Sequence, residues 1–269
     1  MAAPSSNIEA MPVVRDLKDF DLKSGNRLER LIFNNRVPVM LVCLVVTVVL
    51  GFMAARVSLN ASYEKMLPTA HPYIQNYLAN KGQLRGLGNT LRVVVETTQG
   101  DIFDAAYLET LSKVNDELFL TPGVDRAWVK SIWMPVVRYT EVTEEGFAGG
   151  PVMPDTYDGS KASLERLRQN ITKAGLVGSL VANDFKSAMI VVPLLDVDPA
   201  SGNPIDYWAL SHAIEKNVRD KFETADGKYK VRVIGFAKIV GSLLDGILQV
   251  MLYFVAAILI AAAILYYFT

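Results

Sequence analysis

Two long stretches without charged residues dominate the hydrophobic pattern of this chain. They are VPVMLVCLVVTVVLGFMAA at 37–55, between Arg36 and Arg56, and VMLYFVAAILIAAAILYYFT at 250–269. A helix rises about 1.5 Å per residue, so either stretch is long enough to cross the hydrocarbon core of a bilayer. The first stretch lies too far from the N-terminus and is too long for a typical signal peptide. The pattern therefore predicts two membrane-spanning helices, the first an uncleaved anchor.

The distribution of basic residues predicts the orientation. The fifteen residues before the first span carry four Lys or Arg, the fifteen after it carry two, and the fifteen before the second span carry one. By the positive-inside rule, residues 1–36 form a cytoplasmic tail and residues 56–249 an extracytoplasmic domain. In the tail, Val13, Val14, Leu17 and Phe20 have helical spacing. They indicate either an amphipathic helix on the inner leaflet or a loosely ordered tail.

Stretches rich in β-branched or aromatic residues predict four strands between the spans, at 91–98, 126–134, 187–195 and 229–237. Apolar residues at helical intervals predict a helix after the first strand, at 103–119, and another after the third, at 206–222. The apolar face of the second helix carries Trp208, Ile214, Val218 and Phe222. Asp101 and Asp206 are the expected N-caps.

The order of these elements gives two βαβ units, at 91–134 and 187–237, separated by an insertion at 135–186. The insertion begins with a Gly/Pro-rich surface loop at 144–160 and continues as a helix at 161–175. We predict an α+β membrane protein in which the two spans flank a ferredoxin-like domain. The last strand enters the second span through IGFAKIVGSLLDGILQ without a linker, an arrangement suited to transmitting motion.

The composition argues against several kinds of chemistry. A net charge of −1 offers no basic surface for nucleic acid. One cysteine, Cys43, and two separated histidines, His71 and His212, give no metal-ligand cluster or catalytic triad. We therefore expect neither enzymatic activity nor a metal or cofactor.

Two short motifs have ordinary explanations. Gly82, Gly86 and Gly88 precede a strand, whereas a phosphate-binding loop follows one, so they predict a turn. Asp196 and Asp198 lack the complete ligand series of a calcium loop and predict a solvated turn.

Several segments together resemble a known family. A first span, the segment LNASYEKMLPTAHPYIQNY at 59–77, a domain of two βαβ units and IGFAKIVGSLLDGI at 234–247 occur in that order. This arrangement resembles the N-terminal portion of a resistance–nodulation–division (RND) transporter, closest to the MMPL-like branch of hydrophobe/amphiphile exporters.

The resemblance implies a proton-driven exporter of lipids or other hydrophobic or amphiphilic molecules in the bacterial inner membrane, with a periplasmic porter domain. It implies contact with membrane lipids, with the remaining spans or like subunits, and with periplasmic accessory proteins. The proton-relay carboxylates of that family lie in later spans. Neither predicted span contains an Asp or Glu residue. We therefore expect the chain to be a truncated part of a transporter.

The resemblance to a transporter suggests candidate site residues. Trp128, Trp133, Met134 and Tyr139 are candidates for lining a substrate path, with ordinary core packing as the alternative. Lys238 and Asp245, just before the second span, are candidates for coupling the domain to it. For Asp245 the alternative is a helix-end residue at the membrane interface.

Two other kinds of protein share the layout of two spans around a domain. A polysaccharide chain-length regulator would need a very long external helix and a Pro-rich run before the second span. A membrane-anchored periplasmic sensor would need a cytoplasmic output module.

Overall fold

The computed structural model describes residues 26–56, 67–81, 83, 89–144, 146–199 and 201–268. The chain divides into two compact units, 1–59 and 60–269, which are described separately. The tail segment at 13–20 and the glycine cluster at 82–88 fall on residues that lie outside this description, apart from Gln83.

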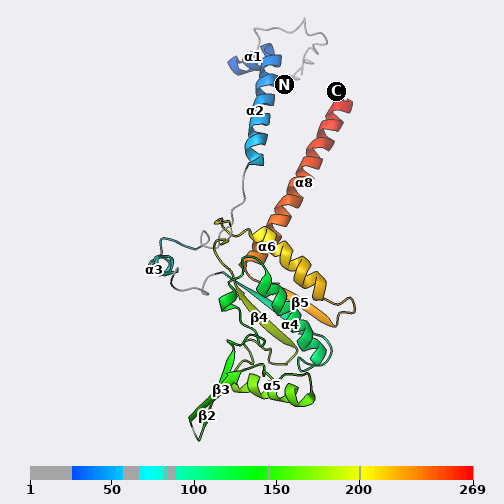
Figure 1. Cartoon of the computed structure of the whole chain (residues 1–269). Helices are drawn as coiled ribbons and strands as arrows, with labels where there is room; N and C mark the ends of the chain where they lie inside the picture. Colours follow the sequence, from blue (N-terminus) through cyan, green and yellow to red (C-terminus); the bar gives the residue numbers. More distant parts are fainter. Residues whose placement is uncertain are drawn as a thin grey trace, which may run out of the picture. The chain divides into compact units, whose positions relative to one another are not determined.

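The first unit contains two helices, α1 (Arg27–Asn34) and α2 (Arg36–Ala55). Asn35 separates them with a non-helical backbone (φ −122°, ψ 45°). Its carbonyl accepts from the Val39 N–H at 2.9 Å, and its side-chain amide donates to the Leu31 carbonyl at 3.1 Å. Figure 1 shows α1 turned away from the axis of α2. α2 is long and apolar enough to cross a membrane.

The second unit is built on a three-stranded sheet of β1 (Thr90–Thr97), β4 (Ser187–Pro193) and β5 (Tyr229–Ile234). The strand order is β4-β1-β5, and β1 is antiparallel to both neighbours. β4 and β5 therefore run in the same direction, with β1 between them. The predictions of strands at 91–98, 187–195 and 229–237 are confirmed to within a few residues.

The prediction of a strand at 126–134 is wrong. Arg126–Trp128 form a 3₁₀ turn, η3, and only Lys130 then pairs with a strand, in an isolated antiparallel bridge to Val191 of β4. The segment bends towards α4 (Ala105–Leu120) because its polar groups find partners there. Ser131 Oγ donates to Asn115 Oδ1 at 2.7 Å, and Trp133 Nε1 donates to the Leu108 carbonyl at 3.1 Å.

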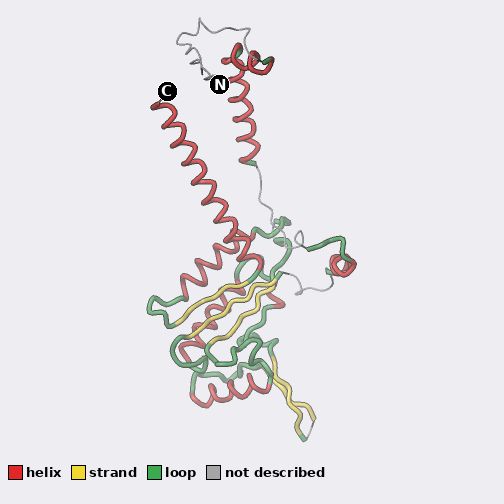
Figure 2. Tube along the Cα trace, turned by 180° about the vertical axis from the view of Figure 1, so that it is seen from behind, coloured by secondary structure: helices red, strands yellow, loops and turns green. Residues whose placement is uncertain are grey.

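α4 and α6 (Tyr207–Ile214) cover one face of the sheet, as the opposite views of Figures 1 and 2 show. α6 continues through a π-helical turn, η4 (Glu215–Arg219), into α7 (Asp220–Phe222). Asp206 caps α6 as predicted, accepting from the Trp208 and Ala209 N–H groups. α4 is capped by Asp104 instead of Asp101. Asp101 stabilises the preceding turn and pairs with Arg168 at 3.0 Å.

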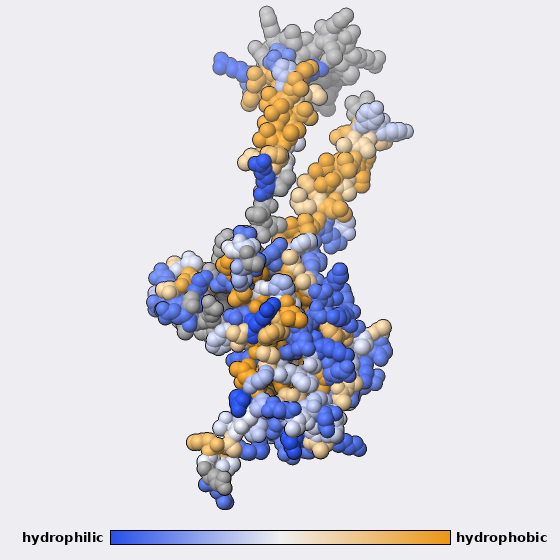
Figure 3. All heavy atoms as spheres, viewed as in Figure 1, coloured by the Kyte–Doolittle hydropathy of each residue, from blue (hydrophilic) through white to orange (hydrophobic). Residues whose placement is uncertain are grey.

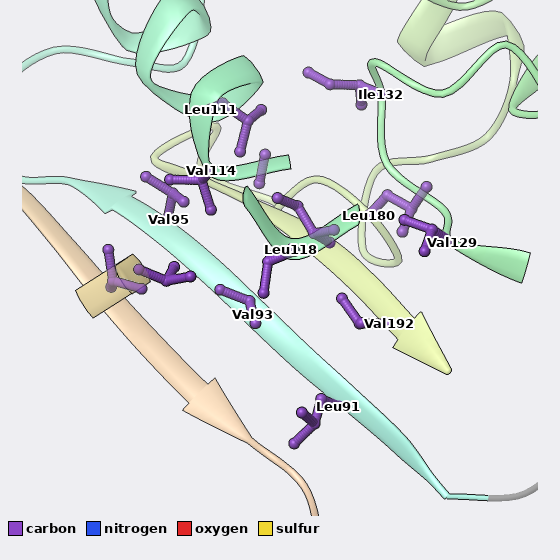
Figure 4. Packing of buried hydrophobic residues seen from close by; sticks show 14 of the residues in the cluster. Leu91, Val93, Val95, Leu111, Val114, Leu118, Val129, Ile132, Leu180 and Val192 are labelled. Carbon is purple, nitrogen blue, oxygen red and sulfur yellow. The ribbon is translucent and has the colours of Figure 1, made fainter. Parts of the chain in front are cut away.

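The core lies between this sheet face and the helices. Along β1, Leu91, Val93 and Val95 alternate with more exposed residues and are almost fully buried. Figure 4 shows them meeting side chains from other parts of the domain: Leu111, Val114, Leu118, Val129, Ile132, Leu180 and Val192. One polar group is built into this core. The Tyr107 hydroxyl donates to the Val95 carbonyl at 2.7 Å and accepts from the Ala188 N–H at 2.9 Å, so α4 is tied to both β1 and β4.

The insertion differs from the expected loop. β2 (Arg138–Thr143) and β3 (Gly146–Pro151) form an antiparallel hairpin, and α5 (Lys161–Lys173) follows where a helix was predicted. The Gly-rich stretch does lie at the surface, but it pairs as a strand because backbone hydrogen bonds need no side chain. α3 (Pro72–Asn80) precedes the sheet in the chain.

The last helix, α8 (Phe236–Phe268), follows β5 after a single residue, Gly235. Gly235 has a φ of 149°, and a Cβ there would lie 2.8 Å from the Thr90 carbonyl oxygen, so glycine is required. The Gly235 carbonyl accepts from the Ile239 N–H at 3.1 Å, which starts the helix. α8 is the second helix long and apolar enough to cross a membrane, and Figure 3 shows its hydrophobic surface. The direct junction expected from the sequence is confirmed.

The mixed α+β class with two membrane-length helices is thus as predicted.

We expect Tyr107→Phe to lower the free energy of unfolding by about 1–2 kcal/mol, because two buried hydrogen bonds are lost without a change in packing. Urea unfolding of the full chain in detergent, followed by tryptophan fluorescence, measures this difference. A stability equal to that of the wild type would show that these bonds contribute nothing.

The stability difference between the wild type and Tyr107→Phe should also depend on pH. Burial raises the pKa of the Tyr107 hydroxyl above its usual value. As the pH rises above about 10, the unfolded chain loses this proton first, so the stability that depends on Tyr107 falls. The stability difference between wild type and Tyr107→Phe should therefore be constant below about pH 10 and shrink above it. Parallel curves across this range would contradict the assignment.

Candidate functional site

The part of the domain next to α8 is held by direct packing of α6 on the first turns of α8. Ala237, Val240 and Gly241 are the buried residues of α8, and they face the buried side of α6. A Cβ atom on Gly241 would overlap the Cβ and Oγ of Ser211. The two helices therefore approach this closely only because position 241 has no side chain.

Polar contacts between Asp245 and two residues of α6 lie one turn further along α8. The Asp245 carboxylate accepts from the Trp208 indole Nε1 at 2.8 Å and lies 2.9 Å from the His212 Nε2. Trp208 and His212 are four residues apart on α6, so both rings face the same point of α8, and their centroids are 4.6 Å apart. Asp245 is thus fixed by two aromatic rings from the preceding helix.

An ion-pair chain lies on the other side of Gly241, towards the sheet. Lys238 Nζ is 2.6 Å from Glu215 Oε1, and Arg219 donates to Glu215 Oε2 at 2.8 Å. Arg219 Nε also donates to the Val231 carbonyl at 3.1 Å. These side chains are about a quarter exposed, so their interactions are less screened than those of surface pairs. These ion pairs and hydrogen bonds connect β5, η4 and α8.

The two predicted coupling residues, Lys238 and Asp245, therefore lie at one junction and contact the same helical segment, α6–η4. Their partners Trp208, His212 and Glu215 were missed. Trp208 was expected on the core face, but it is 38% exposed and faces α8. The i, i+4 spacing of Trp208 and His212 was a signal in the sequence, but nothing there showed that Asp245 lies opposite.

The four path candidates do not form one surface. Trp133 packs edge-on against Tyr157 at 5.5 Å, and the Met134 sulfur accepts from the Asn115 amide at 3.7 Å, so both are part of the packing around α4. Tyr139 lies on the β2–β3 hairpin near Lys173. Trp128 is 44% exposed on η3 and is the most accessible of the four.

A separate hollow of about 380 Å³ lies between the end of α4, the loop before α6 and α6 itself. Its wall includes Gly123, Ile205 and Leu210 together with Asp198 and Asp206, and none of the four path candidates lines it. Asp198 accepts from Ser201 Oγ at 2.8 Å within its turn, and Asp196 pairs with Lys81 at 3.4 Å. In the described part of the chain, no group of three or more His, Cys, Asp or Glu side chains is placed to hold a metal ion.

Neither a protein-family model nor a curated protein matches the chain.

The close contact at Gly241 gives a direct test. Gly241→Ala should lower stability by about 1–3 kcal/mol, because the new methyl group collides with Ser211 in a packed interface. The double variant Gly241→Ala/Ser211→Gly should recover most of this loss. Thermal unfolding of the full chain in detergent measures both.

Gly246→Ala is the matched control on the same helix. Among the described residues, nothing lies within 4 Å of a Cβ at position 246. Alanine favours helix by about 1 kcal/mol over glycine, so this variant should be unchanged or more stable. Equal behaviour of the two glycine variants would contradict the close packing of α6 and α8.

Proposed function

We propose that this chain is the N-terminal part of a proton-driven RND transporter of the MMPL-like branch, which exports lipids or other amphiphilic molecules. The observation that carries the proposal is the junction of β5 and α8. A sheet strand enters a membrane-length helix through one glycine, and the start of that helix is clamped on the domain by Gly241, Lys238 and Asp245. Such a junction suits a protein in which movement of the domain and movement of a membrane helix are coupled.

The arrangement of the sheet supports the same proposal. β4 and β5 are connected by α6 and lie on either side of β1, so they form a split βαβ unit. Lys130 pairs at the free edge of β4 after α4 has crossed the sheet, where the second strand of a first βαβ unit would lie. We propose that the domain is a ferredoxin-like, porter-type domain with a reduced fourth strand.

In this proposal α2 and α8 cross the bacterial inner membrane, the N-terminus is cytoplasmic and the domain is periplasmic. The partners are the substrate, membrane lipids, further spans or like subunits, and periplasmic accessory proteins. The proposal involves no enzymatic step. The two candidate spans contain no Asp or Glu between residues 37–55 or 250–268. Proton coupling would therefore use carboxylates in other spans.

The structure gives less support to a polysaccharide chain-length regulator. Such a protein would need a very long helix outside the membrane, whereas α4, the longest described helix between α2 and α8, has 16 residues. α8 also contains no proline in its 33 residues.

Photo-crosslinking tests the proposal. The full chain is expressed in bacterial membranes and irradiated with a diazirine-bearing fatty-acyl probe, and labelled peptides are mapped by mass spectrometry. A substrate path through the domain predicts labels near Trp128 in addition to those on α2 and α8. Labelling confined to the two helices would contradict the proposal.

Two exposed tryptophans provide a matched comparison. Trp128→Ala should reduce labelling of the domain several-fold, because it removes the most accessible path candidate. Trp208→Ala removes a tryptophan of similar exposure at the junction and should leave labelling near residue 128 unchanged. An equal reduction in both variants would show that the label reports a general change of the domain.

A further inference from the structure

The short helix α1 presents an apolar face that the sequence analysis did not identify. Leu28, Leu31 and Ile32 are spaced i, i+3 and i+4, so they share one face of the helix. They are 66%, 61% and 47% exposed. Asn34 lies outside this face and is also exposed. A water-exposed row of three large aliphatic side chains on so short a helix indicates a surface that is covered in the working protein.

The position of this face limits what can cover it. α1 has eight residues, about 12 Å of helix, and is far too short to span a bilayer. One residue, Asn35, joins it to α2, whose apolar side chains are exposed along its whole length. If α2 crosses a bilayer, α1 is held where the hydrocarbon ends and the headgroups begin.

We propose that α1 is an interfacial helix, lying in the headgroup region with Leu28, Leu31 and Ile32 in the acyl boundary of an anionic phospholipid leaflet. Helices of this kind have an apolar face and a basic polar remainder. Residues 27–36 contain three arginines and one glutamate, so the segment has the charge that attracts anionic headgroups. The bend at Asn35 allows α1 to leave the axis of α2 at this level (Figures 1 and 2).

This inference rests on α2 lying in a bilayer, but it does not depend on transport or on the identity of a substrate. It assigns α1 a mechanical role, in which the helix fixes the depth of the N-terminal end of α2.

Fluorescence of an environment-sensitive label tests the inference. The full chain is reconstituted in vesicles of phosphatidylcholine and phosphatidylglycerol and carries one nitrobenzoxadiazole label. The label is attached to Leu31→Cys or Asn34→Cys in a Cys43→Ser background, or to the native Cys43, which is exposed on α2. Phospholipids with a spin label high on the acyl chain then quench those labels that contact lipid.

The proposal predicts blue-shifted emission and strong lipid quenching at position 31, with weaker effects at position 34. Water-like emission at position 31, or equal quenching at both positions, would overturn it. A blue shift at position 31 without lipid quenching would also overturn it, because a protein surface would then cover the face. Replacing phosphatidylglycerol with phosphatidylcholine should reduce quenching at position 31, and equal quenching in both lipids would overturn the preference for anionic lipid.

The label on Cys43 distinguishes failure of the interfacial helix from failure of the membrane span. Quenching at Cys43 without quenching at position 31 would reject the interfacial helix and leave the membrane span in place. Absence of quenching at Cys43 would reject the span itself, and with it the proposed function.

Discussion

The contact between α6 and α8 at Gly241 is the constraint on which the rest of the domain depends. Without a side chain at this position, the backbone of α8 can come close to the Ser211 side chain, and the other contacts of the junction lie on either side of this approach. Asp245 comes within hydrogen-bond distance of Trp208 and His212, and Lys238 comes within reach of Glu215. Gly235 has a matching role at the other end, where its backbone passes close to Thr90 as β5 becomes α8.

These contacts make the start of α8 part of the domain. The helix continues without interruption from Phe236 to Phe268, about 50 Å, of which only the last two thirds are needed to cross a bilayer. The base of the helix is held by the close contact at Gly241, by the contacts of Asp245 with α6 and by the ion pairs of Glu215, an arrangement suited to passing rotation or tilt of the domain along the helix. A flexible linker would lose this motion.

Local periodicity was enough to predict most of the fold. Enrichment in β-branched and aromatic residues identified three strands, and apolar spacing identified α4 and α6, because each of these helices buries one face. The failures have long-range causes. Residues 126–134 have the composition of a strand, but Ser131 and Trp133 find hydrogen-bond partners on α4 and bend the segment away. The contacts of Asp245 with Trp208 and His212 join residues more than thirty positions apart, and no local pattern places them together.

We expect the domain and the base of α8 to move as one body. Spin labels at Glu109→Cys on α4 and Leu243→Cys on α8, in a Cys43→Ser background, allow their separation to be measured by double electron–electron resonance in lipid nanodiscs. Both positions are exposed, so the labels should not disturb the packing. We predict a single narrow distance distribution. A broad or two-peaked distribution would show a hinge between the domain and α8, and would contradict the claim.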